Sequence, residues 1–207
     1  MLSDEGVVFL KNALLTNEQI LATTENLLRQ NGVTKTAVTD VAKALNVSHA
    51  TIYNYFPNKK TLLAKATENW LQVEIINHLK DIPSTADTLS VEQHLYRYID
   101  MLIKLKRKSA TKDSALFAIY AKVTVSETKV LAHHIQQIHQ HLTLICQRHL
   151  TLADEPCHNL ARFIFSATSK FHHPAHANEW LETAQSDADF ANVWAHIQPL
   201  LNNYHTR

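Results

Sequence analysis

The stretch VAKALNVSHATIYNYFPNKKTLL, residues 41–63, places apolar side chains at helical spacing on both sides of Asn46. Asn46 suits the left-handed conformation that ends many helices, and Pro57 prevents a following helix from continuing. The stretch therefore predicts two short helices joined by a tight turn, which is the helix-turn-helix arrangement. Its predicted buried positions are Ala42, Leu45, Val47, Ile52 and Phe56.

Capping signals place the neighbouring helices. Thr16 and Gln19 have the spacing of a capping box, which predicts a helix that ends near Gly32. Thr36 is predicted to cap the first of the two short helices and Ser48 the second. A fourth helix follows, with an apolar side that extends to about residue 79.

The composition of the remaining chain favours an all-α protein. The 207 residues include only two glycines and five prolines, no long alternating apolar and polar run is present, and 45% apolar residues suffice for a core. Apolar stripes predict helices near residues 91–105, 116–125, 127–150, 156–171 and within 187–204. The basic segment 104–113 is predicted to be a solvated turn.

Positive charge is concentrated near the helix-turn-helix. The whole chain has a formal net charge of +1, whereas residues 33–66 contain five lysines and a single aspartate. A basic module of this kind suits a polyanionic partner, and residues 67–207 lack that signature. The sequence therefore predicts a small basic N-terminal domain, residues 1–66, with an N-terminal arm that has an apolar cluster at residues 7–10. The larger helical domain is residues 67–207.

The second short helix presents side chains that suit DNA. Once Ile52 and Phe56 face inward, nothing in the local pattern buries the others, which are His49, Ala50, Thr51, Tyr53, Asn54 and Tyr55. Hydroxyls, an amide and small side chains suit phosphates and base edges in a major groove. Lys59 and Lys60 follow where flanking phosphates would lie. Periodicity alone also allows an αα-hairpin with a merely polar surface.

Residues 17–65 resemble the N-terminal signature of the TetR (tetracycline repressor) family of transcriptional regulators. Residue types and spacing agree through three helices and two turns, at Gly32, Val33, Thr36, Val38, Val41, Ala42, Leu45, Val47, Ser48, Thr51, Ile52, Tyr53, Tyr55, Phe56, Asn58, Lys59 and Leu62. The chain departs from the family pattern at His49, Ala50 and Lys60, where lysine, glycine and an acidic residue are frequent. These departures affect the expected operator sequence more than the mode of binding.

The resemblance implies a dimeric, all-helical DNA binder that usually represses transcription and releases DNA when a small molecule binds the second domain. It implies phosphate contacts from Thr51, Tyr53, Tyr55 and Lys59, backbone contacts from Thr36 and Thr39, and base reading by His49, Ala50 and Asn54. Ser48, the predicted cap, completes this DNA-binding set. The predicted partners are a double-stranded operator, a second copy of the chain and an unidentified effector.

Two predicted helices of the second domain, at residues 156–171 and within 187–204, are apolar on more than one side. They therefore need neighbours that cover them on two sides. We expect one side to meet the domain core and the other a two-fold partner in a four-helix bundle, where the resembled family dimerises. Burial entirely within one chain is the alternative. The predicted interface residues are Leu160, Phe163, Ile164, Ala167, Phe171, Phe190, Trp194, Ile197 and Leu201.

A ligand cavity is expected among the helices that precede residue 171, because ligand pockets combine apolar walls with a few polar groups. Each of these side chains is also an ordinary candidate for the core. The residues predicted to line the cavity are Trp70, Tyr98, Met101, Phe117, Tyr120 and His134.

The fourteen histidines raise a metal-responsive alternative, through His133, His134, His139, His141 and the group His172, His173 and His176. Histidines three or four apart on a helix can share a metal, but Pro174 interrupts the last group and no His-Glu-x-x-His motif is present. No nucleophile elbow, phosphate loop or paired-carboxylate motif supports an enzyme. The other alternative is a ligand-binding protein that retains the helix-turn-helix fold without acting as a regulator. We therefore predict a non-enzymatic regulator without metal or cofactor.

The sequence also predicts where the protein works. Cys146 and Cys157 form no CxxC pair, and no signal peptide is recognisable, which is typical of reduced cysteines in a cytoplasmic protein. Apolar runs are interrupted well before the roughly 18 residues that a membrane span needs. We therefore expect a cytoplasmic protein that has no membrane partner.

Overall fold

The computed structural model describes residues 15–85, 88–126, 128–180 and 182–204, and in these ranges all the regular elements are helices. The predicted all-α fold is confirmed. Two compact units make up the chain, Met1–Ala66 and Thr67–Arg207. The apolar cluster predicted at residues 7–10 lies outside the described residues.

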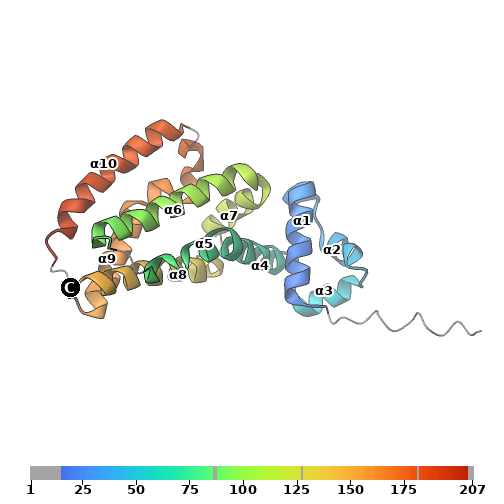
Figure 1. Cartoon of the computed structure of the whole chain (residues 1–207). Helices are drawn as coiled ribbons and strands as arrows, with labels where there is room; N and C mark the ends of the chain where they lie inside the picture. The colour runs from blue at the N-terminus through green and yellow to red at the C-terminus, as the bar shows by residue number, and fades with distance from the viewer. Residues whose placement is uncertain (1–14, 86–87, 127, 181, 205–207) are drawn as a thin grey trace, which may run out of the picture. The chain divides into compact units, whose positions relative to one another are not determined.

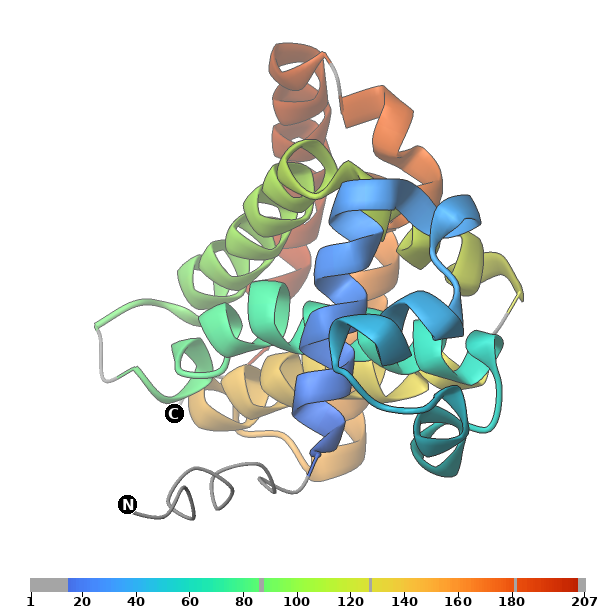
Figure 2. The ribbon, with the colours of Figure 1, turned by 90° about the vertical axis from the view of Figure 1, so that its right-hand side faces the viewer.

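The first unit contains α1 (Asn17–Lys35), α2 (Val38–Ala44), α3 (His49–Tyr55) and the beginning of α4 (Lys59–Leu71). The capping box that begins α1 is confirmed. The backbone N–H of Gln19 donates to Thr16 Oγ1, and Gln19 Oε1 accepts from the backbone N–H of Thr16. Gly32 has a φ of 72° and interrupts α1, as its predicted place at a helix end requires. Figure 2 shows α1, α2 and α3, coloured blue to cyan, packed close together.

The start of α2 differs from the prediction. The N-cap is Ala37, whose backbone N–H donates to the Asp40 carboxylate at 2.7 Å. Thr36 is instead buried, and its hydroxyl donates to the Gly32 carbonyl at 2.8 Å, so it ties the end of α1 rather than capping α2. Asn46, with a φ of 54°, has the left-handed conformation that was predicted. Ser48 caps α3, because its Oγ accepts from the Thr51 amide at 3.1 Å.

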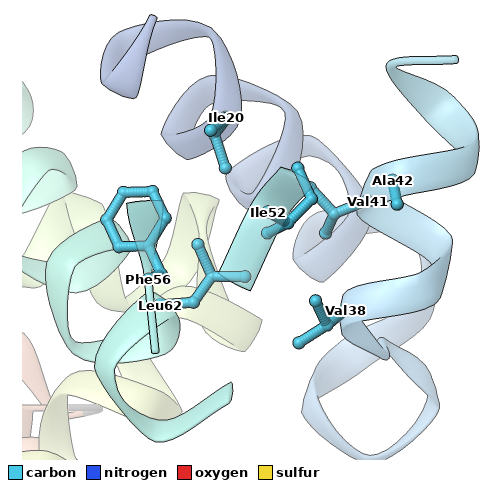
Figure 3. Close-up of a cluster of buried hydrophobic side chains, with 7 residues drawn as sticks. All are labelled: Ile20, Val38, Val41, Ala42, Ile52, Phe56 and Leu62. Atoms are coloured by element: carbon cyan, nitrogen blue, oxygen red, sulfur yellow. The ribbon is translucent and has the colours of Figure 1, made fainter. Parts of the chain in front are cut away.

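A single apolar cluster holds the helix-turn-helix together, and its members come from α1 through α4 (Figure 3). Ile52 and Phe56 belong to it, so the prediction that they face inward is confirmed. The predicted positions Leu45 and Val47 are half-buried at its edge. The cluster consists of Ile20, Val38, Val41, Ala42, Ile52, Phe56 and Leu62.

The second unit begins within α4, which continues through a π-helical segment (Gln72–Ile76) and α5 (Asn77–Leu79). After a 3₁₀ turn (Ile82–Ser84) come α6 (Val91–Lys112), α7 (Ser114–Ser126), α8 (Thr128–His149) and α9 (Asp154–Ala167). Two 3₁₀ segments (Ser169–Phe171 and Pro174–Trp180) then lead to α10 (Thr183–Leu201).

The predicted solvated turn at 104–113 is wrong. Helix α6 runs without interruption to Lys112, and Lys106, Ser109 and Asp113 are buried. The buried face of α6 continues from Leu102 at spacings of three and four residues. The buried stripe therefore extends through this segment in spite of its basic residues. Exposed cations occupy the other faces of the last turns.

Within the second unit, α6 lies between α10 and α8, and α8 packs along α9 (Figure 1). Buried side chains of α6 therefore face neighbours that are distant in the sequence. This arrangement places Lys106 against groups from α7 and α8.

Candidate functional site

Helix α3 presents an exposed polar face in the first unit. Its one fully buried side chain is Ile52, whereas His49, Ala50 and Asn54 are exposed and 43% of Tyr53 is accessible. The rings of His49 and Tyr53 meet edge to face, with centroids 6.3 Å apart. The local pattern therefore holds one side of this short helix in the core and leaves the predicted base-reading side chains accessible.

The cap of α3 orders two hydroxyls beside this face. Ser48 Oγ lies 2.9 Å from Thr51 Oγ1, and the Ser48 side chain is exposed while Thr51 is half-buried. Thr39, near the start of α2, is also exposed. These three hydroxyls are accessible groups that can donate hydrogen bonds to a phosphate.

Tyr55 and Lys59 already make hydrogen bonds to the backbone. The Tyr55 hydroxyl donates to the Leu15 carbonyl at 2.7 Å, and Lys59 Nζ donates to the Val33 carbonyl at 3.2 Å. Tyr55 therefore ties α3 to the residue that precedes α1, and Lys59 ties the start of α4 to α1 itself. A phosphate contact by either side chain has to share or replace its present partner.

Thr36 does not fit its predicted role at the DNA backbone. Its exposed fraction is 2%, and its hydroxyl is used by the Gly32 carbonyl. Sequence spacing placed Thr36 at a helix start, but the kink at Gly32 turns the side chain inward. Lysines 35, 43, 60 and 65 are exposed in the same unit and supply its positive surface.

A small cavity lies inside the second unit, with a volume of about 40 Å³. Its walls come from α6, α7, α8, α9 and the segment that follows α9. The lining residues are Lys106, Tyr120, Thr124, Leu131, His134, Ile135, Ile138, Phe165, His172 and His173. This volume holds about one water molecule, so a larger ligand has to displace side chains.

Lys106 is the most unusual residue of the cavity, because only 1% of it is exposed. Its Nζ lies 2.9 Å from the Tyr120 hydroxyl and 2.9 Å from His134 Nε2. Within the described part of the chain no carboxylate pairs with this ammonium. Burial lowers the pKa of Lys106 well below its ordinary value, because water no longer solvates the charge.

His134 has an unused polar atom in this cavity. When its Nε2 accepts from Lys106, the proton of the neutral ring is on Nδ1, which is buried and has no hydrogen-bond partner. Burial and then the charge of Lys106 lower the pKa of His134 well below the ordinary value, so the neutral ring is favoured. Among the described residues, the cavity thus contains a buried amino group that no carboxylate neutralises and a ring N–H that has no hydrogen-bond partner.

The predicted cavity residues separate into three groups. Tyr120 and His134 line the cavity, as predicted. Trp70 and Phe117 pack on Tyr120, with centroids 6.3 and 5.6 Å from its ring, and so lie one layer away. Two residues do not reach the cavity at all. The prediction is wrong for Met101, which is 38% exposed, and Tyr98 is buried elsewhere with its hydroxyl 2.9 Å from His141 Nδ1.

Sequence reasoning missed Lys106 and His172 as cavity residues. The α6 stripe continued from Leu102 by four residues points to Lys106, but a charged side chain at that position favours solvent. For His172 the sequence suggests only a role as a metal ligand. Its Nε2 lies 3.2 Å from both the Phe165 carbonyl and Thr168 Oγ1.

The predicted interface residues are mostly buried inside the chain. Of the predicted set, Phe163 is exposed, at 45%, and Ala167 is half-buried. Helix α10 turns its apolar stripe toward α6, and the indole of Trp194 donates to Glu92 on that helix at 2.6 Å. The prediction that these side chains face a partner is therefore wrong for Leu160, Ile164, Phe171, Phe190, Trp194, Ile197 and Leu201.

The histidine groups do not assemble a metal site. In the described ranges no set of three or more His, Cys, Asp or Glu side chains is arranged to hold a metal ion. His141 lies beside Tyr98, and His176 Nδ1 lies 2.6 Å from Glu179, so these rings have other partners. A larger hollow of about 330 Å³ is also not a better candidate for a ligand site. Lys170 in its wall already forms ion pairs with Asp189 and Glu179.

Two regions of the chain match described families. Residues 91–194 match the tetracyclin repressor-like C-terminal domain, and residues 20–66 match the bacterial regulatory proteins of the tetR family. The first match alone covers half of the chain. In the described residues, no helix has the length and apolar character that a membrane span requires.

Individual relatives share the fold or part of the sequence. The chain is similar to the probable acrEF/envCD operon repressor of Escherichia coli K12, with 37% identity over 67 residues. That alignment covers 32% of this chain and only 29% of the repressor. The TetR transcriptional regulator of Legionella pneumophila has a TM-score of 0.54 and 22% identity, over 91% of this chain and 98% of that chain. BioQ, solved with its double-stranded DNA operator, has a TM-score of 0.52 and 15% identity, over 88% and 99% of the two chains.

Proposed function

The chain belongs to the TetR family of bacterial regulatory proteins, and from this membership we propose that it is a DNA-binding transcriptional repressor. A homodimer binds a palindromic operator and releases it when a small molecule occupies the second unit. The exposed polar face of α3 carries the proposal, because Ile52 fixes the helix in the core while His49 and Asn54 stay accessible. The cytoplasm, where bacterial DNA lies, is the proposed location.

Each subunit places α3 in a major groove. His49, Ala50 and Asn54 contact base edges, while Ser48, Thr51 and Tyr53 contact phosphates together with Thr39 of α2. Tyr55 and Lys59 support the arrangement through their bonds to Leu15 and Val33, and they add phosphate contacts where they share those bonds. Two-fold symmetry sets the half-sites about one helical turn, ~34 to 36 Å, or a multiple of it apart.

The test is selection of bound duplexes from a random pool by the purified full-length protein, at one stated moderate salt concentration. We expect enrichment of a palindrome. His49→Ala and Asn54→Ala change the selected sequence, because each removes a base contact, whereas Tyr53→Ala weakens binding to all sequences. Lys80→Ala, an exposed lysine of α5's end in the second unit, is the matched control. No enrichment by folded protein, or equal effects of the three variants, would contradict the assigned roles.

The homodimer in this proposal uses an apolar surface that differs from the sequence prediction. Leu144 of α8 and Phe163 of α9 are 52% and 45% exposed, on helices that pack along each other. Exposed apolar side chains on adjacent helices suit a two-fold bundle. Light scattering should give a dimer for the wild type and a monomer for Phe163→Glu. Val73→Glu, which changes another exposed apolar side chain, should stay dimeric.

Effector control follows from the place of α4. This helix begins in the first unit and contributes Trp70 to the second, where Trp70 packs on Tyr120 of the cavity. A ligand that displaces Tyr120 alters the packing of Trp70. The ligand changes DNA affinity only if it binds one conformation more tightly than the other.

A further inference from the structure

The cavity at Lys106 has the chemistry of an anion site. The ammonium is almost completely buried, and its two hydrogen-bond partners, Tyr120 and His134, are neutral groups. Buried charges in proteins are normally paired with an opposite charge. The described residues supply no such charge to Lys106, and a bound anion would complete this site.

The neighbouring hydrogen bonds leave donors available for that charge. The Tyr120 oxygen accepts from Lys106, which leaves the hydroxyl hydrogen free to donate. His134 Nδ1 is a second buried donor without a partner. An oxygen anion next to Nζ would accept from both groups, and such charge-assisted bonds are stronger than neutral ones.

The rest of the wall determines what the anion is attached to. Leu131, Ile135 and Ile138 of α8 and Phe165 of α9 form the apolar part of the lining. A purely inorganic ion would leave this surface without a contact. A ligand with both a charged head and an apolar body would satisfy both halves of the lining.

Resting on the proposed effector-responsive function, we propose that this cavity binds a small monocarboxylate, or a similar monoanion, that carries an apolar body. The head pairs with Lys106 and accepts from Tyr120 and His134. The body packs on the apolar side chains of α8. Because the empty cavity measures only about 40 Å³, the body has to push side chains apart, and Tyr120 is placed to transmit that displacement to Trp70.

The probes for the test are hexanoate and hexanamide, which have the same apolar chain and differ in charge. Titration calorimetry on the full-length protein should show hexanoate binding at least tenfold more tightly than hexanamide. Inorganic phosphate should bind more weakly than hexanoate, because it lacks the apolar body. Equal affinities for hexanoate and hexanamide would overturn the anion site, and phosphate binding as tight as that of hexanoate would overturn the apolar part of the inference.

Variants localise the effect. Lys106→Met replaces the ammonium by an apolar chain of similar length and should reduce the affinity for hexanoate to that for hexanamide. Lys108→Met, on the exposed side of the same helix, should keep the full preference. Circular dichroism establishes that each variant is folded. Tyr120→Phe, which leaves Lys106 in place, should still prefer hexanoate over hexanamide but bind hexanoate more weakly. An undiminished preference in Lys106→Met would refute the site.

The selected operator separates this inference from the proposed function. Hexanoate should release the operator from the wild type and not from Lys106→Met. If hexanoate binds tightly but never weakens operator binding, the proposal that apolar monocarboxylates act as effectors is contradicted. Failure of the ligand-free protein to bind any DNA sequence would instead contradict the proposed repressor function, whatever the calorimetry shows.

Discussion

Replacing His172 with glutamine should make the second unit less sensitive to acid. The imidazole is buried, and its Nε2–H donates toward the Phe165 carbonyl and Thr168 Oγ1, both 3.2 Å away. Burial lowers the pKa of His172 to about 3, and the charge of Lys106 adds to this effect, whereas the ordinary value is 6.5. A glutamine amide keeps a donor in this region but does not titrate.

The sign and size follow from proton binding. Below pH 6.5 the unfolded chain protonates this histidine while the folded protein does not, so acid favours unfolding until the pH falls to the folded-state pKa. Stability is therefore fully retained above pH 6.5 and is lost as the pH falls toward 3. At pH 5 the loss from His172 alone is about 2 kcal/mol, and near pH 3 it is roughly 4 kcal/mol.

Urea unfolding at pH 7.5 and pH 5 measures this loss of unfolding free energy. The protein concentration is kept fixed because a dimer is proposed. Tryptophans 70, 180 and 194 all lie in the second unit, so their fluorescence follows the unit that contains His172. The wild-type protein should lose about 2 kcal/mol more than His172→Gln between the two pH values. His196→Gln, which changes an exposed histidine of α10, serves as the control and should behave as the wild type. An equal loss in wild type and His172→Gln would refute the assignment.

Three further substitutions test how local structure supports the fold. Gly32→Ala should destabilise the first unit by about 1–3 kcal/mol in chemical unfolding, because a φ of 72° with a ψ of 173° is essentially restricted to glycine. No atom lies within 4 Å of the added Cβ, so an effect near zero would show that the backbone relaxes. Ile52→Val should cost about 0.5–1.5 kcal/mol through a lost core methylene, and unchanged stability would contradict its burial. Trp70→Phe removes the 3.2 Å bond from the indole to Asp113 and should lower the stability of the second unit by about 1.5–3 kcal/mol, with far-UV circular dichroism reporting the midpoint. A wild-type midpoint would mean that the bond contributes nothing.

Local chemistry made the helix-turn-helix predictable. The Thr16 capping box, the left-handed Asn46 and the Ser48 cap each depend on residues within a few positions of one another. The inward direction of Ile52 and Phe56 follows from a spacing of four on a short helix that has one buried side. For these features the sequence neighbours and the spatial neighbours are the same residues.

Packing between distant segments decided what the sequence left open. Spacing identifies an apolar stripe but does not say which neighbour covers it. The sequence therefore predicts a partner contact for the stripe of α10, which in the structure faces α6. The charge of Lys106 suggested solvent, whereas the length of α6 and the positions of Tyr120 and His134 bury it.

The sequence by itself therefore determined the all-α class, the helix-turn-helix and the exposed polar face of α3, because short-range periodicity, caps and turn residues encode them. Only the tertiary structure decided that Lys106 lies in a cavity, that Met101 lies outside it and that Phe163 stays exposed on α9. The physical reason is that burial of a side chain on a long helix depends on which other helices pack against that side. Those contacts join residues far apart in the chain, and helical spacing alone does not specify them.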